Sequence, residues 1–153
     1  MEGRGFKVVG VQEVLKNILA PKGRLGKAEP NSQQQQDIKT GAEILRKIGG
    51  LDIGQAVVVE DGIVLAVEAV EGTANMLARA GGLKKSYGGV LVKLKKSGQS
   101  DKADLPSVGP DTVAQIAAAG ISGIAVEAGH SLVLEKEKLI EKADAAGVFV
   151  VGI

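Results

Sequence analysis

Two glutamates, a glycine and a threonine near the middle of the chain could hold a divalent cation and a phosphate together. Glu68 and Glu71 are followed by Gly72 and Thr73. Threonine often caps a helix, and the backbone N–H groups after a cap have no partner inside the helix. A helix start favours an anion and carboxylates favour Mg²⁺, so metal and phosphate could meet here. The alternative is a strand–loop–helix unit with a purely structural role.

A β-hairpin is needed to place these carboxylates. Asp61-Gly62 separates two β-branched runs, and Asp-Gly is one of the strongest short hairpin signals. A two-residue turn there predicts three facing pairs: Val59 with Val64, Val57 with Ala66, and Gln55 with Glu68. Gln55 is therefore expected beside Glu68, in the one polar pair on an otherwise apolar face.

Strand-like and helix-like segments alternate along the rest of the chain, which indicates an α/β domain. Asn31 or Ser32 is expected to cap a helix that ends near Ile48, and Gly81-Gly82 is expected to end the helix that Thr73 begins. Further helices are expected near 110–119 and 136–146, and strands near 6–9, 90–94, 121–127, 131–134 and 148–153. Right-handed crossovers and the early hairpin predict one mixed, partly parallel sheet flanked by helices. The Gly/Pro-rich segment 20–30 is predicted to be a linker or surface loop.

Composition narrows the chemistry that is available. The 153 residues include three aromatics, one histidine and no cysteine, and the net charge is +1. Thiolate and His-rich metal sites are therefore excluded, and the few aromatics argue against a base-stacking surface for single strands. No apolar run approaches transmembrane length. Carboxylates, lysines, hydroxyls and amides remain, an inventory that suits Mg²⁺ and phosphate. Lys93, at the end of an apolar strand, is the preferred lysine for a phosphate, whereas His130 is expected in a surface or hydrogen-bonding role.

Five stretches, in this order, resemble one known family. They are Asp52–Val59, Ala66–Thr73, Gly89–Lys93, Asp104–Thr112 and Ile124–Gly129. The family is the carboxy-terminal domain of the bacterial UDP-2,3-diacylglucosamine pyrophosphatases that are unrelated to calcineurin-like phosphoesterases. The resemblance covers nearly the whole chain, from about Phe6 to Ile153.

The resemblance implies an enzyme of lipid A biosynthesis. Such enzymes use Mg²⁺ to hydrolyse the phosphoanhydride of UDP-2,3-diacylglucosamine, which yields 2,3-diacylglucosamine 1-phosphate and UMP. It also implies a two-domain protein at the inner face of the inner membrane, on the cytoplasmic side. Residues 1–30 would then be the end of an amino-terminal domain and a linker, and residues 31–153 the catalytic-type domain. The partners implied are the lipid substrate or product and the amino-terminal domain; the apolar content of the chain adds an expectation of self-association.

The resemblance assigns roles to individual residues. Glu68 and Glu71 become metal or water-positioning carboxylates, and Gln55 orients Glu68. The phosphate would be bound by Gly72, Thr73 and Lys93, while Asp104 and Glu127 become candidate substrate-binding residues. Ala74 stands where the family carries an acidic residue that activity needs, so turnover by this chain is expected to be impaired. The alternative is a non-catalytic domain that binds a nucleotide or lipid phosphate, or that mediates oligomerisation.

Overall fold

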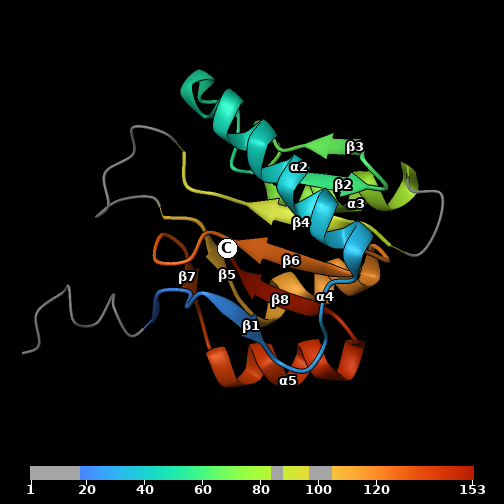
Figure 1. The fold of residues 1–153 in the computed structure, drawn as a ribbon, viewed down its shortest axis with the longest axis vertical. Helices are drawn as coiled ribbons and strands as arrows, with labels where there is room; N and C mark the ends of the chain where they lie inside the picture. Colours follow the sequence, from blue (N-terminus) through green and yellow to red (C-terminus); the bar gives the residue numbers. More distant parts are fainter. Residues whose placement is uncertain (1–17, 84–87, 97–104) are drawn as a thin grey trace, which may run out of the picture.

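The computed structural model describes residues 18–83, 88–96 and 105–153, and it is built on one six-stranded sheet (Figure 1). The strands in spatial order are β1 (Gly23–Leu25), β8 (Phe149–Gly152), β6 (Gly123–Val126), β4 (Val90–Lys93), β2 (Ala56–Glu60) and β3 (Ile63–Val67). A separate two-stranded sheet joins β5 (Ser107–Val108) to β7 (Leu132–Val133). The helices are α2 (Ser32–Ile48), the 3-10 turn η2 (Gly49–Leu51), α3 (Thr73–Leu83), α4 (Pro110–Ala118) and α5 (Lys136–Ala146).

The main sheet is mixed, as the sequence predicted. Strands β4, β6 and β8 are parallel, whereas β2 pairs antiparallel with β4, β3 with β2, and β1 with β8. The arrowheads of β4, β6 and β8 point to the same side in Figure 1, towards the C-terminus of the chain. The start of β2 and the end of β3 therefore lie at the same end of the sheet as the carboxyl ends of the parallel strands. We call this end the carboxyl edge of the sheet.

Helices cover both faces of this sheet. Helix α2 lies on one face, where Ile38, Ala42 and Leu45 pack against alternate valines of β2 and β4. Helices α3, α4 and α5 bury their apolar residues against the other face. Gly41 allows α2 to approach closely, because a Cβ there would lie 2.7 Å from a methyl group of Val92.

The β2–β3 hairpin turns at the predicted residues but has a different register beyond the turn. Asp61 and Gly62 both have positive φ, 50° and 78°, as a type I′ turn requires. The Val59–Val64 pair is confirmed, whereas the Val57–Ala66 pair is wrong. Val57 instead faces Val67, because the ladder shifts by one residue between Val58 and Val59. The extra residue is Leu65, and both Leu65 and Ala66 pack against the cluster under α3.

Three other sequence predictions are corrected, and one is confirmed. The segment predicted as linker or loop contains the edge strand β1, which pairs with β8. Thr73 is the first residue of α3 rather than its cap, and Gly81-Gly82 lies inside that helix. Gly81 has a packing role in the helix, since its missing side chain leaves room for Ala119, whose backbone would lie 3.2 Å from a Cβ. Asn31 caps α2 as predicted, and Gln34 completes a capping box. The strand predicted near Phe6 lies outside the described residues.

Candidate functional site

The sheet register explains why residues far apart in sequence meet at one edge. Ala56 pairs with Lys93 across β2 and β4, and the Glu68 N–H donates to the Ala56 carbonyl at 2.9 Å. Lys93 in turn pairs with Val126, so Glu127 follows at the end of the next strand. Because ligands of open α/β sheets bind outside the carboxyl ends of the strands, this edge is the candidate site.

Glu68 is a buried carboxylate held at both of its oxygens, with 9% of its surface exposed. Its Oε1 accepts from the main-chain N–H of Gln55 at 3.2 Å, and its Oε2 accepts from the Thr73 hydroxyl. The predicted facing pair of Gln55 with Glu68 is wrong, because the shifted ladder brings Ala56 opposite Glu68. Gln55 still lies beside Glu68, as predicted, and its main-chain N–H makes the contact. An ionised carboxylate offers about four acceptor positions, so two partners leave room for water or a cation.

Lys93 places a cation at the same edge. Its side chain is half-buried at the end of β4, and Nζ donates to the Ser107 carbonyl at 3.1 Å. Burial lowers the pKa of Lys93, while the negative charge of Glu68 acts in the opposite direction. Since an ammonium has three donors, Lys93 retains capacity for a phosphate oxygen.

Glu71 is held by an arginine of α3. Its Oε1 forms an ion pair with Arg79 Nη2, and its Oε2 accepts from Arg79 Nε at 3.4 Å. The same Nη2 donates to the Val67 carbonyl at 3.3 Å, and the pairing with Glu71 raises the pKa of Arg79. Glu71 is therefore fixed between the end of β3 and α3.

Of the two carboxylates predicted to bind a metal, only Glu68 is arranged to hold Mg²⁺. Mg²⁺ is usually held by one or two carboxylates, with substrate phosphates and waters completing the shell. Glu68 meets this requirement, whereas Glu71 would first have to leave Arg79. Within the described ranges, no three acidic, histidine or cysteine side chains cluster closely enough to hold a metal. Asp104, which was predicted to bind substrate, lies outside the described residues.

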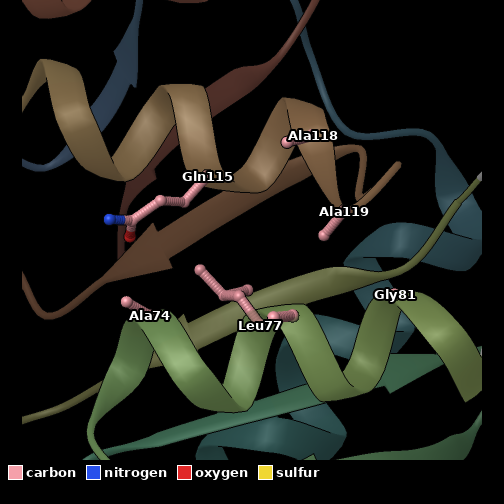
Figure 2. Close-up of a pocket in the computed structure, with 7 residues that line it drawn as sticks. Ala74, Leu77, Gly81, Gln115, Ala118 and Ala119 are labelled. Atoms are coloured by element: carbon pink, nitrogen blue, oxygen red, sulfur yellow. The ribbon is translucent and has the colours of Figure 1, made fainter.

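Ala74 lies one residue beyond Thr73 and faces a groove of about 370 Å³ between α3 and α4 (Figure 2). Figure 2 shows Gln115 reaching from α4 towards the end of the groove that Ala74 occupies. The remaining lining residues are small or apolar: Leu77, Ala78, Gly81, Ala118 and Ala119. An acidic side chain at position 74 would therefore stand at the mouth of an apolar groove. Sequence reasoning missed Gln115, since only the packing of α3 on α4 brings it to the groove.

Glu127 and His130 lie together in a different pocket. The Oε2 of Glu127 accepts from the main-chain N–H of Lys95 at 3.1 Å. Both residues line a pocket of about 240 Å³ with Arg46, Lys95 and other residues. The structure thus brings Gln55 and Thr73 each into direct contact with Glu68 and keeps Glu127 among different partners.

Gly72 has the conformation that its position requires. Its φ is +83°, which glycine adopts readily, and the turn returns its N–H to the Ala69 carbonyl at 3.4 Å. The helix begins at the next residue, Thr73, whose hydroxyl is directed to Glu68. The start of α3 and the buried carboxylate are therefore joined by one hydrogen bond.

Two comparisons with known proteins agree on one family. A family model described as the LpxI C-terminal domain matches residues 21–151. The chain is 43% identical over 159 residues to UDP-2,3-diacylglucosamine pyrophosphatase LpxI of Caulobacter vibrioides. That alignment covers 99% of this chain and 57% of the relative, so the chain spans little more than half of the relative's length. Among solved structures, the apo crystal structure of dCMP deaminase from the cyanophage S-TIM5 gives a TM-score of 0.44. It is 18% identical, with 78% of this chain and 96% of that chain covered.

None of the helices in residues 18–83, 88–96 and 105–153 combines the length and the apolar character needed to cross a bilayer.

Proposed function

The chain belongs to the LpxI C-terminal domain family, and we propose that it provides one part of a UDP-2,3-diacylglucosamine pyrophosphatase. The reaction would add water to a phosphorus of the diphosphate and break its bond to the bridging oxygen. The products are UMP and 2,3-diacylglucosamine 1-phosphate. The observation that carries this proposal is a buried carboxylate, Glu68, at the same sheet edge as the partly desolvated ammonium of Lys93.

Lys93 would stabilise the charge of the diphosphate. Displacement at phosphorus relies on positioned cations and donors more than on covalent chemistry by the protein. The Nζ of Lys93 is anchored on the Ser107 carbonyl and is already partly removed from water. Little reorganisation is then needed when a phosphate oxygen approaches.

Glu68 would orient the attacking water or hold Mg²⁺. Two protein groups donate to it, the main-chain N–H of Gln55 and the Thr73 hydroxyl, and they fix the direction of its remaining acceptor positions. Mg²⁺, when bound, would neutralise charge on the phosphate oxygens. Glu71 would hold α3 in position through its ion pair with Arg79.

The groove at Ala74 would accept an acyl chain of the lipid. It begins one residue from Thr73 and continues along α3 among small and apolar side chains (Figure 2). Apolar substrate atoms in this groove would then lie next to the proposed diphosphate site. Gln115, at the same end of the groove, would donate or accept a hydrogen bond where the chain joins the sugar.

A second function, binding without turnover, is favoured by one residue. Ala74 supplies no carboxylate where the resemblance implies one, so this chain would hold a nucleotide or lipid phosphate with little hydrolysis. Both functions use the same sheet edge, and they differ in whether UMP is released.

A chimaera separates the two functions. This chain would replace the matching part of the Caulobacter relative, and Mg²⁺-dependent release of UMP would be measured with and without Ala74→Asp. We expect Ala74→Asp to raise the rate about 10-fold or more. Even the residues that only orient metal ligands usually contribute about 10–100-fold to metal affinity or activity. The matched control is Ala78→Asp, which places a carboxylate in the same groove one helical turn away. Equal rates for the unchanged chimaera and Ala74→Asp would show that position 74 has no catalytic role.

A further inference from the structure

A second pocket lies at the same edge of the sheet but on the face that α2 covers. Its volume is about 240 Å³, and its floor is formed by Leu45 and Leu94, which are 5% and 4% exposed. Both leucines belong to the apolar cluster beneath α2. Lys93, by contrast, directs its ammonium to Ser107 of β5, whose neighbour Val108 belongs to the cluster on the other face. This pocket is therefore distinct from the Glu68–Lys93 pair.

Cationic side chains outnumber anionic ones in the lining of this pocket. Arg46, Lys95 and Lys96 contribute three positive charges, and Glu127 contributes one negative charge. They come from the last turn of α2, the segment after β4 and the segment after β6. The tertiary fold brings these side chains together from three separate segments. The pocket is therefore more than a run of solvated lysines along the sequence.

Two contacts fix the arrangement of these charges. The Oε2 of Glu127 accepts from the main-chain N–H of Lys95, which ties the carboxylate to the backbone beneath it. Lys96 Nζ contacts Asp52 Oδ1 at 2.8 Å, and this contact lowers the pKa of Asp52. Even with Asp52 counted, the cations outnumber the carboxylates by three to two. The pocket therefore favours an anion.

Its size limits what can enter. Sites for drug-sized ligands usually have about 300–1,000 Å³, so this pocket suits one group of a ligand rather than a whole nucleotide sugar. A guanidinium and ammonium groups are the usual protein partners of phosphate. A tetrahedral anion with several acceptor oxygens fits both the volume and the charge.

We infer that this pocket binds the phosphate group of a phosphate monoester, as a site separate from the Glu68–Lys93 edge. Two sources carry that chemistry. One is the nucleoside monophosphate that the reaction would release, and this source rests on the proposed function. The other is inorganic phosphate or a small phosphate ester, and this source is independent of it.

The sole histidine of the chain provides a direct probe. Because His130 lines the pocket, the ring signals of one residue report its occupancy in a proton NMR spectrum. The chain would be titrated with inorganic phosphate, UMP and uridine. We expect saturable shifts with phosphate and UMP and none with uridine. Tighter binding of UMP than of phosphate would identify the nucleotide as the source, and equal binding would identify the phosphate group alone.

Charge-matched variants locate the binding. Arg46→Gln should weaken the affinity for phosphate about 10-fold, which is the usual scale for losing one charge-assisted contact. Lys47→Gln removes the same charge from the same turn of α2 but does not line the pocket, so its affinity should change less than about 2-fold. Equal weakening by both variants would show a general charge effect and overturn the inference.

Two further results would overturn the inference. One is the absence of a saturable shift at roughly 10 mM phosphate or UMP, which lies beyond any useful affinity. The other is loss of binding in Lys93→Gln with no change in Arg46→Gln. That second result would place the phosphate at the Glu68–Lys93 edge and would support the proposed function while removing this pocket.

Discussion

Two buried carboxylates lie at opposite ends of the β2–β3 hairpin, and they differ in the groups that they bind. Asp37 of α2 is 1% exposed at the turn end of the hairpin, and Glu68 is 9% exposed at the open end. Asp37 accepts from the backbone N–H groups of Asp61 and Gly62 at 3.0 and 2.8 Å, and from the Gln33 amide at 3.1 Å. The two turn donors hold the turn against the helix, whereas Gln33 lies on α2 itself, four residues before Asp37.

The partners of each carboxylate distinguish a structural role from a chemical one. Asp37 receives two backbone amides of one tight turn, an arrangement that stabilises the turn. Glu68 receives one amide and one hydroxyl, and its charge acts on a half-buried lysine at the carboxyl edge of the sheet. Burial alone therefore does not identify a functional carboxylate, whereas its neighbours do.

The largest expected effect is on catalysis at Glu68. In the chimaera that carries Ala74→Asp, Glu68→Gln should lower Mg²⁺-dependent UMP release roughly 100-fold, the scale for removing one positioned electrostatic group. The substitution keeps the shape of the side chain, so thermal unfolding should change little. A rate within about 2-fold of the parent would remove Glu68 from the mechanism.

The next effect is on stability at Asp37. Asp37→Ala should lower the free energy of unfolding by about 2–4 kcal/mol, because two backbone amides of the turn lose a charged acceptor. Urea denaturation measures the change. Asp61→Asn is the control, since asparagine also suits the positive φ of the turn and leaves both amides in place. If Asp37→Ala is as stable as Asp61→Asn, the turn does not depend on the carboxylate.

The sequence predicts the turn of this hairpin better than its register. Asp61-Gly62 is a local signal that depends only on two residues, and it was correct. The bulge at Leu65 could not be seen, because every residue from Ile63 to Val67 is apolar and the alternation therefore has no phase. A one-residue shift then changed the Val57 pair while the Gln55–Glu68 contact survived through a backbone amide.

The site was predictable where its residues are close in sequence or are brought together by the tight turn, as Gln55 and Glu68 are. Glu68 and Thr73 are five residues apart, and they make contact. The pairing of Glu71 with Arg79 depends on how α3 leaves the strand, and the groove at Ala74 depends on how α3 packs on α4. Asp37 was missed because its partner turn lies 24 residues away. Such contacts come from tertiary packing, which a periodic pattern does not specify.

A smaller effect concerns the desolvated cation at Lys93. Burial lowers its pKa, so between the folded value and the unfolded value of about 10.4 the unfolded chain binds more protons. Stability of the unchanged chain should therefore rise with pH through that window. Lys93→Met should be more stable at pH 7 by roughly 1 kcal/mol, and its advantage should shrink towards pH 10. An advantage that does not vary with pH would contradict the role of the lysine charge.

The smallest effect concerns the outer edge of β3, the strand that precedes Glu68. Ile63 is 57% and Val64 is 39% exposed on this edge strand, which favours pairing with another chain. Ile63→Lys should weaken self-association about 3–10-fold in sedimentation experiments. Val70→Lys is the control, because Val70 is fully exposed beyond the strand. A strict monomer at high concentration would exclude this association altogether.

One titration tests the central difference between the two carboxylates most directly. The main-chain N–H of Gln55 reports on Glu68, and the main-chain N–H of Gly62 reports on Asp37, since each donates a hydrogen bond to that carboxylate. The chain would be titrated with Mg²⁺ and UDP while both amides are followed by NMR. We predict a saturable shift of the Gln55 amide, removed by Lys93→Gln, with the Gly62 amide unchanged. Equal shifts at both amides, or an unmoved Gln55 amide, would contradict the placement of the diphosphate at the Glu68–Lys93 edge.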